Sequence, residues 1–222
     1  MHIIKQTDVP KIIQPYITDN PIILEVGAFK GNDTVRLAAA LPTAHIYAFE
    51  PVPELYDLLV SNTRIYANVT PVHAAASEQN GTMPLYLSKK TTGRTTQASS
   101  LQKPKERLVH SPIIFPETIM VPTVNLTTWA QDNKISHIDM LWLDTQGHEM
   151  IILESIKNTL LSKIRTIYTE VGFTEAYEGQ VHAEQVIAWL QTNGFTPIAQ
   201  DFQNPPKWFF GNVLFVRNDL IS

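Results

Sequence analysis

Three groups of residues combine side-chain types and spacings that could carry chemistry. The first runs from Glu25 through Gly27 to Gly31, where a predicted strand turns into a predicted helix. Glycines at such a turn let a ligand approach the backbone closely, and the N-terminus of a helix favours polar or anionic groups. The Gly-x-x-x-Gly spacing differs from the Gly-x-Gly-x-x-Gly pattern of dinucleotide-binding folds. A ligand site and a tight turn without a ligand are therefore both open.

The second group is Glu50, which ends the next predicted strand. It stands about as far downstream as the acid that binds ribose in nucleotide folds. A carboxylate can accept hydrogen bonds from both hydroxyls of a ribose. The alternative is a solvated acid before Pro51. Because the tips of adjacent parallel strands lie together, Glu25 and Glu50 favour a shared ligand site.

The third group places Asp144, His148 and Glu149 where another predicted strand meets a helix. Several ionisable groups at one strand tip are typical of active sites. Glu149 could instead be an acid stabilised by the helix dipole, and His148 could be a bystander. No second histidine follows one helical turn later, so this is not the zinc-protease motif. Glu170 ends the neighbouring predicted strand and could face Asp144 or pair with a basic side chain.

The elements that must position these residues alternate between short apolar runs and helical patterns. We predict strands at residues 21–26, 45–50, 69–77, 82–87, 138–144 and 164–171, with a final pair at 196–202 and 211–216. Helices are predicted from residue 32 to 41, from 53 onward, from 149 to 160 and from 182 to 191. This alternation indicates an α/β fold, with a mostly parallel sheet covered by helices on both faces.

Two local details follow from the side chains. Asn32 or Asp33 would cap the first helix, because their side chains can accept hydrogen bonds from its free N–H groups. Leu55, Leu58 and Leu59 would share the buried face of the second helix.

Composition limits the class of protein. The chain has 222 residues, a net charge of −4, 44% apolar residues and no cysteine. Its length fits one domain over residues 1–222. The lack of cysteine excludes disulfide scaffolds, thiolate zinc sites and cysteine nucleophiles, and the charge gives no basis for a general nucleic-acid binder. No apolar run approaches the ~18 residues that a membrane span needs, so we expect a cytoplasmic protein without a membrane partner.

The segment of residues 88–116 stands apart because it lacks periodicity. It holds six basic residues against one acid before residue 111: Lys89, Lys90, Arg94, Lys103, Lys105 and Arg107 against Glu106. A loop of this length in a compact domain is usually a functional lid or a disordered insert. We expect a basic loop that is mobile in the free protein and closes over the bound substrate.

Taken together, the motifs resemble those of the FkbM-type methyltransferases. The resemblance covers about residues 22–195 and rests on LEVGAFKGNDT, YAFEPVP, HAAASEQNG, Ser99-Ser100-Leu101, DMLWLDTQGHE, and TEV followed by Tyr177 and Asn193-Gly194-Phe195. It implies a Rossmann-like class I methyltransferase that uses S-adenosyl-L-methionine and acts on a hydroxyl of a sugar or small-molecule natural product.

The resemblance also assigns site residues. Those implied to bind the cofactor are Glu25, Gly27, Ala28, Phe29, Gly31, Thr34, Glu50, Pro51, Ala75, Ser77 and Asp144. Within this set Glu50 would hold the ribose, and Ala75 and Ser77 would lie near the adenine. The catalytic block would be Asp144, His148 and Glu149.

Methyl transfer to an alcohol needs in-line alignment and a positioned base. His148 is the preferred base by its intrinsic pKa. Asp144 could replace it, or could orient the acceptor while Glu149 fixes the imidazole tautomer. A divalent ion between Asp144 and Glu170 is a further option.

Other functions are conceivable from the same residues. A non-catalytic module could bind S-adenosyl-L-methionine and hold an anionic partner through the basic loop. The glycine spacing disfavours a nicotinamide-dependent oxidoreductase, and one charged loop is thin support for a nucleic-acid substrate. The partner that we expect is a small-molecule or glycan hydroxyl acceptor.

Overall fold

The computed structural model describes residues 1–222 except 111, 204–205, 207–208 and 222. Its main sheet has eight strands, in the spatial order β1 (His2–Ile3), β10 (Phe195–Gln200), β11 (Phe210–Arg217), β9 (Ile164–Gly172), β8 (Ile138–Leu143), β2 (Ile22–Val26), β3 (His45–Phe49) and β4 (Val69–Val72). Strand β11 runs antiparallel to both its neighbours, and the other adjacent pairs are parallel. The predicted mostly parallel sheet with a C-terminal antiparallel pair is confirmed.

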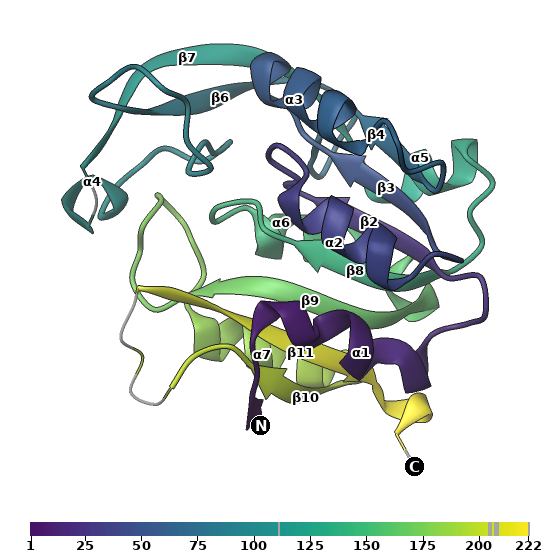
Figure 1. Cartoon of the computed structure of the whole chain (residues 1–222). Coiled ribbons are helices and arrows are strands. Elements are labelled where there is room, and N and C mark those ends of the chain that lie inside the picture. Colours follow the sequence, from purple (N-terminus) through teal and green to yellow (C-terminus); the bar gives the residue numbers. More distant parts are fainter. Residues whose placement is uncertain (111, 204–205, 207–208, 222) are drawn as a thin grey trace.

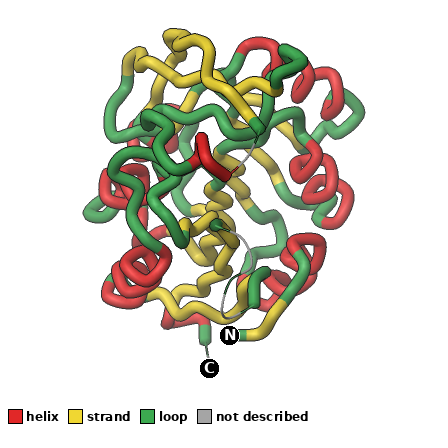
Figure 2. Tube along the Cα trace, turned by 90° about the vertical axis from the view of Figure 1, so that its left-hand side faces the viewer, coloured by secondary structure: helices red, strands yellow, loops and turns green. Residues whose placement is uncertain are grey.

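Helices cover both faces of this sheet, as Figure 2 shows with the strands between two helical layers. One face carries α5 (Leu126–Asp132), α6 (Glu149–Ile156) and α7 (Ala183–Thr192). The other carries α1 (Val9–Ile13), α2 (Asn32–Ala40) and α3 (Pro53–Thr63). Every residue of β8 is buried, as expected for a central strand that packs on both sides. Short 3-10 turns lie at Gln6–Asp8, Gln14–Tyr16, Leu161–Lys163 and Asn218–Leu220.

Two local predictions on this side of the sheet are wrong. Neither Asn32 nor Asp33 caps α2, because Gly31 takes the cap position with φ +82°. A Cβ at Gly31 would lie 2.8 Å from the Leu59 side chain, so the glycine lets α2 begin against α3. Leu58 is 46% exposed, while Leu55 and Leu59 are buried.

A second, three-stranded sheet arches over one end of the main sheet (Figure 1). It consists of β5 (Ala75–Ala76), β7 (Ile113–Val124) and β6 (Gly81–Lys90), in that order. The single strand predicted at 69–77 is therefore two strands in two sheets, and the run 82–87 belongs to the second sheet.

The limits predicted for the basic loop are also wrong, because β6 extends to Lys90 and β7 begins at Ile113. The sequence did not predict β7 because Pro116 and Pro122 interrupt it, and proline has no backbone N–H to donate within a sheet. The structure tolerates them because β5 pairs with β7 at only two positions. Between the two strands lies the short helix α4 (Arg107–His110). In the described part of the chain, no helix has the length and apolarity to cross a membrane.

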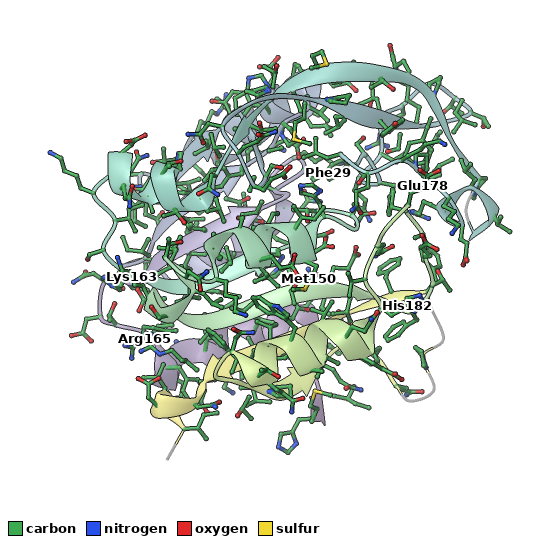
Figure 3. All side chains as sticks on the ribbon, turned by 180° about the vertical axis from the view of Figure 1, so that it is seen from behind. Phe29, Met150, Lys163, Arg165, Glu178 and His182 are labelled. Carbon is green, nitrogen blue, oxygen red and sulfur yellow. The ribbon has the colours of Figure 1, made fainter. Side chains whose placement is uncertain are left out.

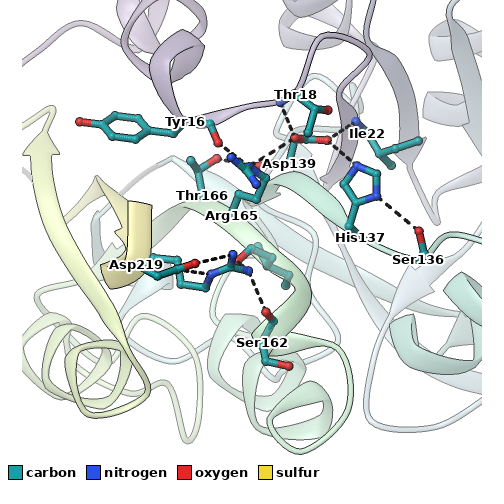
Figure 4. Close-up of polar contacts among 12 residues, drawn as sticks. Tyr16, Thr18, Ile22, Ser136, His137, Asp139, Ser162, Arg165, Thr166 and Asp219 are labelled. Carbon is teal, nitrogen blue, oxygen red and sulfur yellow. Dashed lines mark hydrogen bonds and ion pairs between the residues drawn. The ribbon is translucent and has the colours of Figure 1, made fainter. Parts of the chain in front are cut away.

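A buried carboxylate fixes the N-terminal segment to the sheet (Figure 4). Asp139 at the start of β8 is 0% exposed and accepts hydrogen bonds of 2.8 Å from the backbone N–H groups of Thr18 and Ile22. The Nε atom of Arg165 lies 3.6 Å from the same carboxylate and donates to the carbonyl of Tyr16. These contacts join three segments at the amino ends of the central strands.

We expect Asp139→Ala to lower the free energy of unfolding by about 2–4 kcal/mol, because it leaves two backbone donors and the partly buried guanidinium of Arg165 without their acceptor. Urea denaturation followed by circular dichroism measures the change. The matched control is Asp219→Ala, which breaks the exposed ion pair with Arg217 and should cost far less. Equal losses in the two variants would contradict the structural role of Asp139.

Candidate active site

A cavity opens at the carboxyl ends of β2, β3 and β8, beneath the second sheet. Its free space, which includes open solvent at its mouth, is about 880 Å³. The wall is made by residues 26–29, 50–52, 74–76, 96–97, 99–101 and 144–146, with contributions from Asn32, Asp33, Leu55, Leu85 and His148. In open α/β sheets, ligands bind at the point where the order of the strands across the sheet reverses. Strand β2, which lies between β8 and β3, stands at such a point.

Gly27 lies where the end of β2 meets the end of β8, and only a glycine fits at this position. Its φ is +94°, and a Cβ there would lie 1.8 Å from the carbonyl oxygen of Asp144. Its own N–H donates to the carbonyl of Phe49 over 3.0 Å. The glycine therefore brings the ends of β2, β3 and β8 together, which a side chain at this position would prevent.

Glu50 lies in the cavity wall at the end of β3 and is 5% exposed. One of its oxygens accepts a 2.8 Å hydrogen bond from the N–H of Val52. Burial raises the pKa of Glu50 to about 8. Glu25 is buried behind the wall, next to Thr34, and burial raises its pKa to about 8 as well.

The structure thus divides the residues predicted to bind the cofactor. Those in the cavity wall are Gly27, Ala28, Phe29, Glu50, Pro51, Ala75 and Asp144. Those buried behind the wall are Glu25, Gly31, Thr34 and Ser77. Figure 3 shows Phe29 between the main sheet and the second sheet.

Glu149 supports the loop that follows β8. Its carboxylate accepts hydrogen bonds from the N–H of Thr145 at 2.7 Å, the hydroxyl of Thr145 at 2.9 Å and the N–H of Gly147 at 3.0 Å. Burial raises the pKa of Glu149 to about 7. The structure therefore connects Glu149 to the loop backbone, whereas the sequence suggested a contact with the imidazole of His148.

His148 lines the cavity and is 3% exposed. Its Nε2 lies 3.0 Å from the hydroxyl of Ser77 and 3.8 Å from the carboxylate of Glu78. Burial lowers the pKa of His148 to about 4, although the charge of Glu78 acts in the opposite direction. The imidazole is therefore neutral at physiological pH, and its affinity for a proton is low.

Asp144 and Glu170 are joined by a residue that the sequence did not single out. The amide nitrogen of Gln146 lies 2.8 Å from Oδ1 of Asp144 and 3.0 Å from Oε2 of Glu170. Burial raises the pKa of both carboxyl groups, and for Glu170 the charge of Asp144 adds to the effect. The expected proximity of Asp144 and Glu170 is correct, and a side-chain amide lies between them.

Part of the predicted basic loop forms one wall of the cavity. Residues 94–100 return antiparallel to β6, with bridges between Tyr86 and Ser100 and between Lys89 and Thr95. Ala98 is 1% exposed, and its carbonyl accepts a 2.8 Å hydrogen bond from the hydroxyl of Tyr177. This stretch is therefore packed against the loop after β9.

Three of the six basic side chains of the segment are paired with acids: Lys89 with Glu117, Lys103 with Glu178, and Lys105 with Glu175. Figure 3 shows Glu178 on the loop that follows β9. The charge that the sequence concentrates here is thus partly neutralised by distant residues.

Comparison with known proteins identifies relatives. A model of the methyltransferase FkbM domain matches residues 25–197. The chain is 30% identical over 203 residues to 2-O-methyltransferase NoeI of Sinorhizobium fredii, which covers 90% of this chain and 80% of that protein. It is 24% identical over 200 residues to methyltransferase sdnD of Sordaria araneosa, covering 81% of this chain and 75% of that protein.

A solved structure agrees with the fold. The methyltransferase FkbM from Methylobacillus flagellatus KT superposes with a TM-score of 0.54 at 10% identity, over 97% of this chain and 56% of that chain. Such low identity supports the fold alone. The family model spans most of the chain, and this confirms the resemblance seen in the motifs. The chain therefore belongs to the FkbM family of methyltransferases, with S-adenosyl-L-methionine as the methyl donor.

Proposed function

We propose that this methyltransferase acts on a hydroxyl group of a sugar or a small-molecule natural product. The observation that carries the proposal is the cavity that joins Glu50, at the tip of β3, to Asp144, at the tip of β8. A carboxylate that could accept hydrogen bonds from a ribose and a candidate catalytic base thus line the same cavity. The name of the relative NoeI, a 2-O-methyltransferase, supports a hydroxyl as the acceptor.

The residues of the cavity fit S-adenosyl-L-methionine. Glu50 can accept hydrogen bonds from two ribose hydroxyls, and Phe29, Pro51 and Ala75 offer apolar surface to an adenine ring. The Nδ1 atom of His148 is buried and has no hydrogen-bond partner among the described residues. It is therefore a polar atom that a ligand could satisfy.

Charge around the cavity also suits this ligand. Glu50 and Asp144 stand in the wall, and Glu25, Glu149 and Glu170 are buried behind it. A cluster of acids in a poorly solvated place favours a ligand with positive charge. The cofactor brings a sulfonium and an ammonium group, and when bound it supplies an electrophilic methyl group.

We assign the role of base to Asp144 in preference to His148. A catalytic base works best when its pKa lies near the operating pH. Burial moves the pKa of Asp144 upward, toward that range, and moves the pKa of His148 down to about 4. The low proton affinity of His148 suits a residue that shapes the cavity wall together with Ser77.

The remaining catalytic assignments follow from the contacts. Glu149 positions the loop that carries Gln146 and His148, because its carboxylate binds two N–H groups of that loop. The amide of Gln146 lies between Asp144 and Glu170, at the position that the sequence left open for a divalent ion. Among the described residues, no three His, Asp or Glu side chains gather in a way that could hold a metal ion.

The alternative of a non-catalytic module that holds an anionic partner receives less support. It depended on the basic charge of the segment 88–116, and three of those six side chains are already paired with acids. The part of the wall that residues 96–97 and 99–101 contribute faces a cavity that Glu50 and Asp144 also line, which disfavours an anion there.

Glu50→Ala should weaken binding of S-adenosyl-L-methionine by roughly ten- to a hundred-fold, because it removes charge-assisted hydrogen bonds to the ribose. Isothermal titration calorimetry measures the affinity. Glu184→Ala, an exposed acid in the first turn of α7, is the matched control and should bind as the wild type does. An unchanged affinity in Glu50→Ala would remove Glu50 from the cofactor site.

Asp144→Asn should lower turnover at saturating cofactor by about 10²–10⁴-fold, the usual contribution of a positioned base. The wild-type rate should fall as the pH drops through the pKa of the base, because the protonated base cannot accept the acceptor's proton. His148→Ala should keep this acidic limb. Initial rates on a panel of glycosides and hydroxylated small molecules, measured against pH, test both variants.

Loss of the acidic limb in His148→Ala, with the limb retained in Asp144→Asn, would restore His148 as the base. Wild-type protein that binds the cofactor but methylates no hydroxyl in the panel, and methylates an amine instead, would contradict O-methylation.

A further inference from the structure

Gln146 holds an unusual backbone conformation in the cavity wall. Its φ is +56°, in the left-handed region that side chains other than glycine rarely adopt. Strained backbone of this kind persists where surrounding contacts enforce it, and it clusters at functional sites. The side chain at this position is 8% exposed and lines the cavity.

Separate parts of the chain enforce this conformation. The carboxylate of Glu149 binds the N–H groups on either side of Gln146, those of Thr145 and Gly147. The hydroxyl of Ser100 donates a 2.8 Å hydrogen bond to the carbonyl of Gln146. Tyr177 packs so closely that a Cβ at Gly147 would lie 3.1 Å from its ring. Three anchors therefore hold one short loop.

The result is a defined orientation of the Gln146 amide. Its nitrogen faces Asp144 and Glu170, and its oxygen lies 3.2 Å from the hydroxyl of Tyr177. Asp144 in its ionised form only accepts hydrogen bonds, so the NH₂ group must be the end that faces it. One side-chain amide thus supplies a donor to each of two acids, the partly buried Asp144 and the buried Glu170.

The surroundings of Asp144 make this donor important. Among the described residues, the ionisable groups seen to interact with it are acidic and come from several elements: Glu25, Glu50, Glu149, Tyr168, Glu170 and Asp201. The guanidinium of Arg107 acts on Glu170, the second acid of the pair, and lowers its pKa against the effect of burial. Without the amide of Gln146, the negative form of Asp144 would lose its hydrogen-bond donor while its acidic neighbours remained.

We propose that Gln146 is a positioning residue, which clamps Asp144 and Glu170 into one unit and keeps Asp144 able to take the proton of the acceptor hydroxyl. This inference rests on the proposed O-methylation and on Asp144 as its base. The anchors on the loop serve to place this amide, and Glu170 is the second carboxylate that the clamp holds.

The step balances with Asp144 as the proton acceptor. The acceptor oxygen attacks the methyl carbon and forms an O–C bond, while the C–S bond breaks and its electron pair stays on sulfur. The hydroxyl proton passes to the Asp144 carboxylate. One carboxylate charge and the sulfonium charge disappear together, and Gln146 keeps its hydrogen bonds to the carboxyl oxygens that it faces.

The test is a titration of the Asp144 carboxyl group in the free protein, followed by NMR of protein labelled with ¹³C at aspartate carboxyls. The signal is assigned with Asp144→Asn. Gln146→Met keeps the length of the side chain but removes the donor, so it should move the Asp144 midpoint upward by about one pH unit. Glu170→Gln keeps the clamp and removes a neighbouring charge, so it should move the midpoint downward.

Gln200→Met is the control, because Gln200 is 3% exposed and its amide binds the carbonyl of Phe202 outside the cavity wall. It should leave the midpoint unchanged. An unchanged midpoint in Gln146→Met, or shifts of the same sign in Gln146→Met and Glu170→Gln, would overturn the clamp. Should Gln146→Met fail to fold, the downward shift in Glu170→Gln still has to appear.

Turnover separates this inference from the proposed function. On any hydroxyl acceptor that the wild type methylates, Gln146→Met should lower kcat by roughly ten- to a hundred-fold. Its Kd for S-adenosyl-L-methionine should stay close to that of the wild type. An unchanged kcat would overturn the positioning role and leave O-methylation intact. A wild type that methylates no hydroxyl would overturn the proposed function, while the NMR titration would still decide whether the clamp exists.

Discussion

The site depends on the close approach of two strand ends at Gly27. A Cβ there would collide with the carbonyl oxygen of Asp144, so the tips of β2 and β8 can meet only around a glycine. The same residue donates to Phe49, which brings the tip of β3 to the junction. Because all three tips converge, a group at the end of β3 and a group at the end of β8 line one cavity.

This convergence forces several carboxyl groups into a poorly solvated place. Desolvation raises the pKa of Glu25, Glu50, Asp144, Glu149 and Glu170. The fold limits the free-energy cost of this desolvation by supplying hydrogen-bond donors. These are a backbone N–H to Glu50, two backbone N–H groups and a hydroxyl to Glu149, and one shared amide to Asp144 and Glu170. Such a cluster is destabilising by itself, and a cationic ligand would relieve it.

The sequence alone revealed the parts of the fold that are local. Central strands such as β8 are mostly apolar runs, and the sequence predicts their limits to within one or two residues. The hairpin of β6 and β7 was missed because Pro116 interrupts its pattern, and residues 94–100 were missed because distant contacts such as Tyr177 hold them. For the site, Asp144 and Glu50 stood out by position. The importance of Gln146 depends on Glu149 and Ser100, and the low pKa of His148 depends on burial, neither of which a motif displays.

The central claim is that buried carboxyl groups at the three strand tips receive a cationic methyl donor. Calorimetric titration of the protein with S-adenosyl-L-methionine at pH 7, repeated in buffers of different ionisation enthalpy, tests it most directly because the buffer dependence counts protons released on binding. Glu50 has a pKa of about 8 in the free protein, so it is largely protonated at that pH and should ionise when it accepts hydroxyl donors beside a cation. The account predicts net proton release. Binding with the same heat in every buffer, or proton uptake, would contradict it.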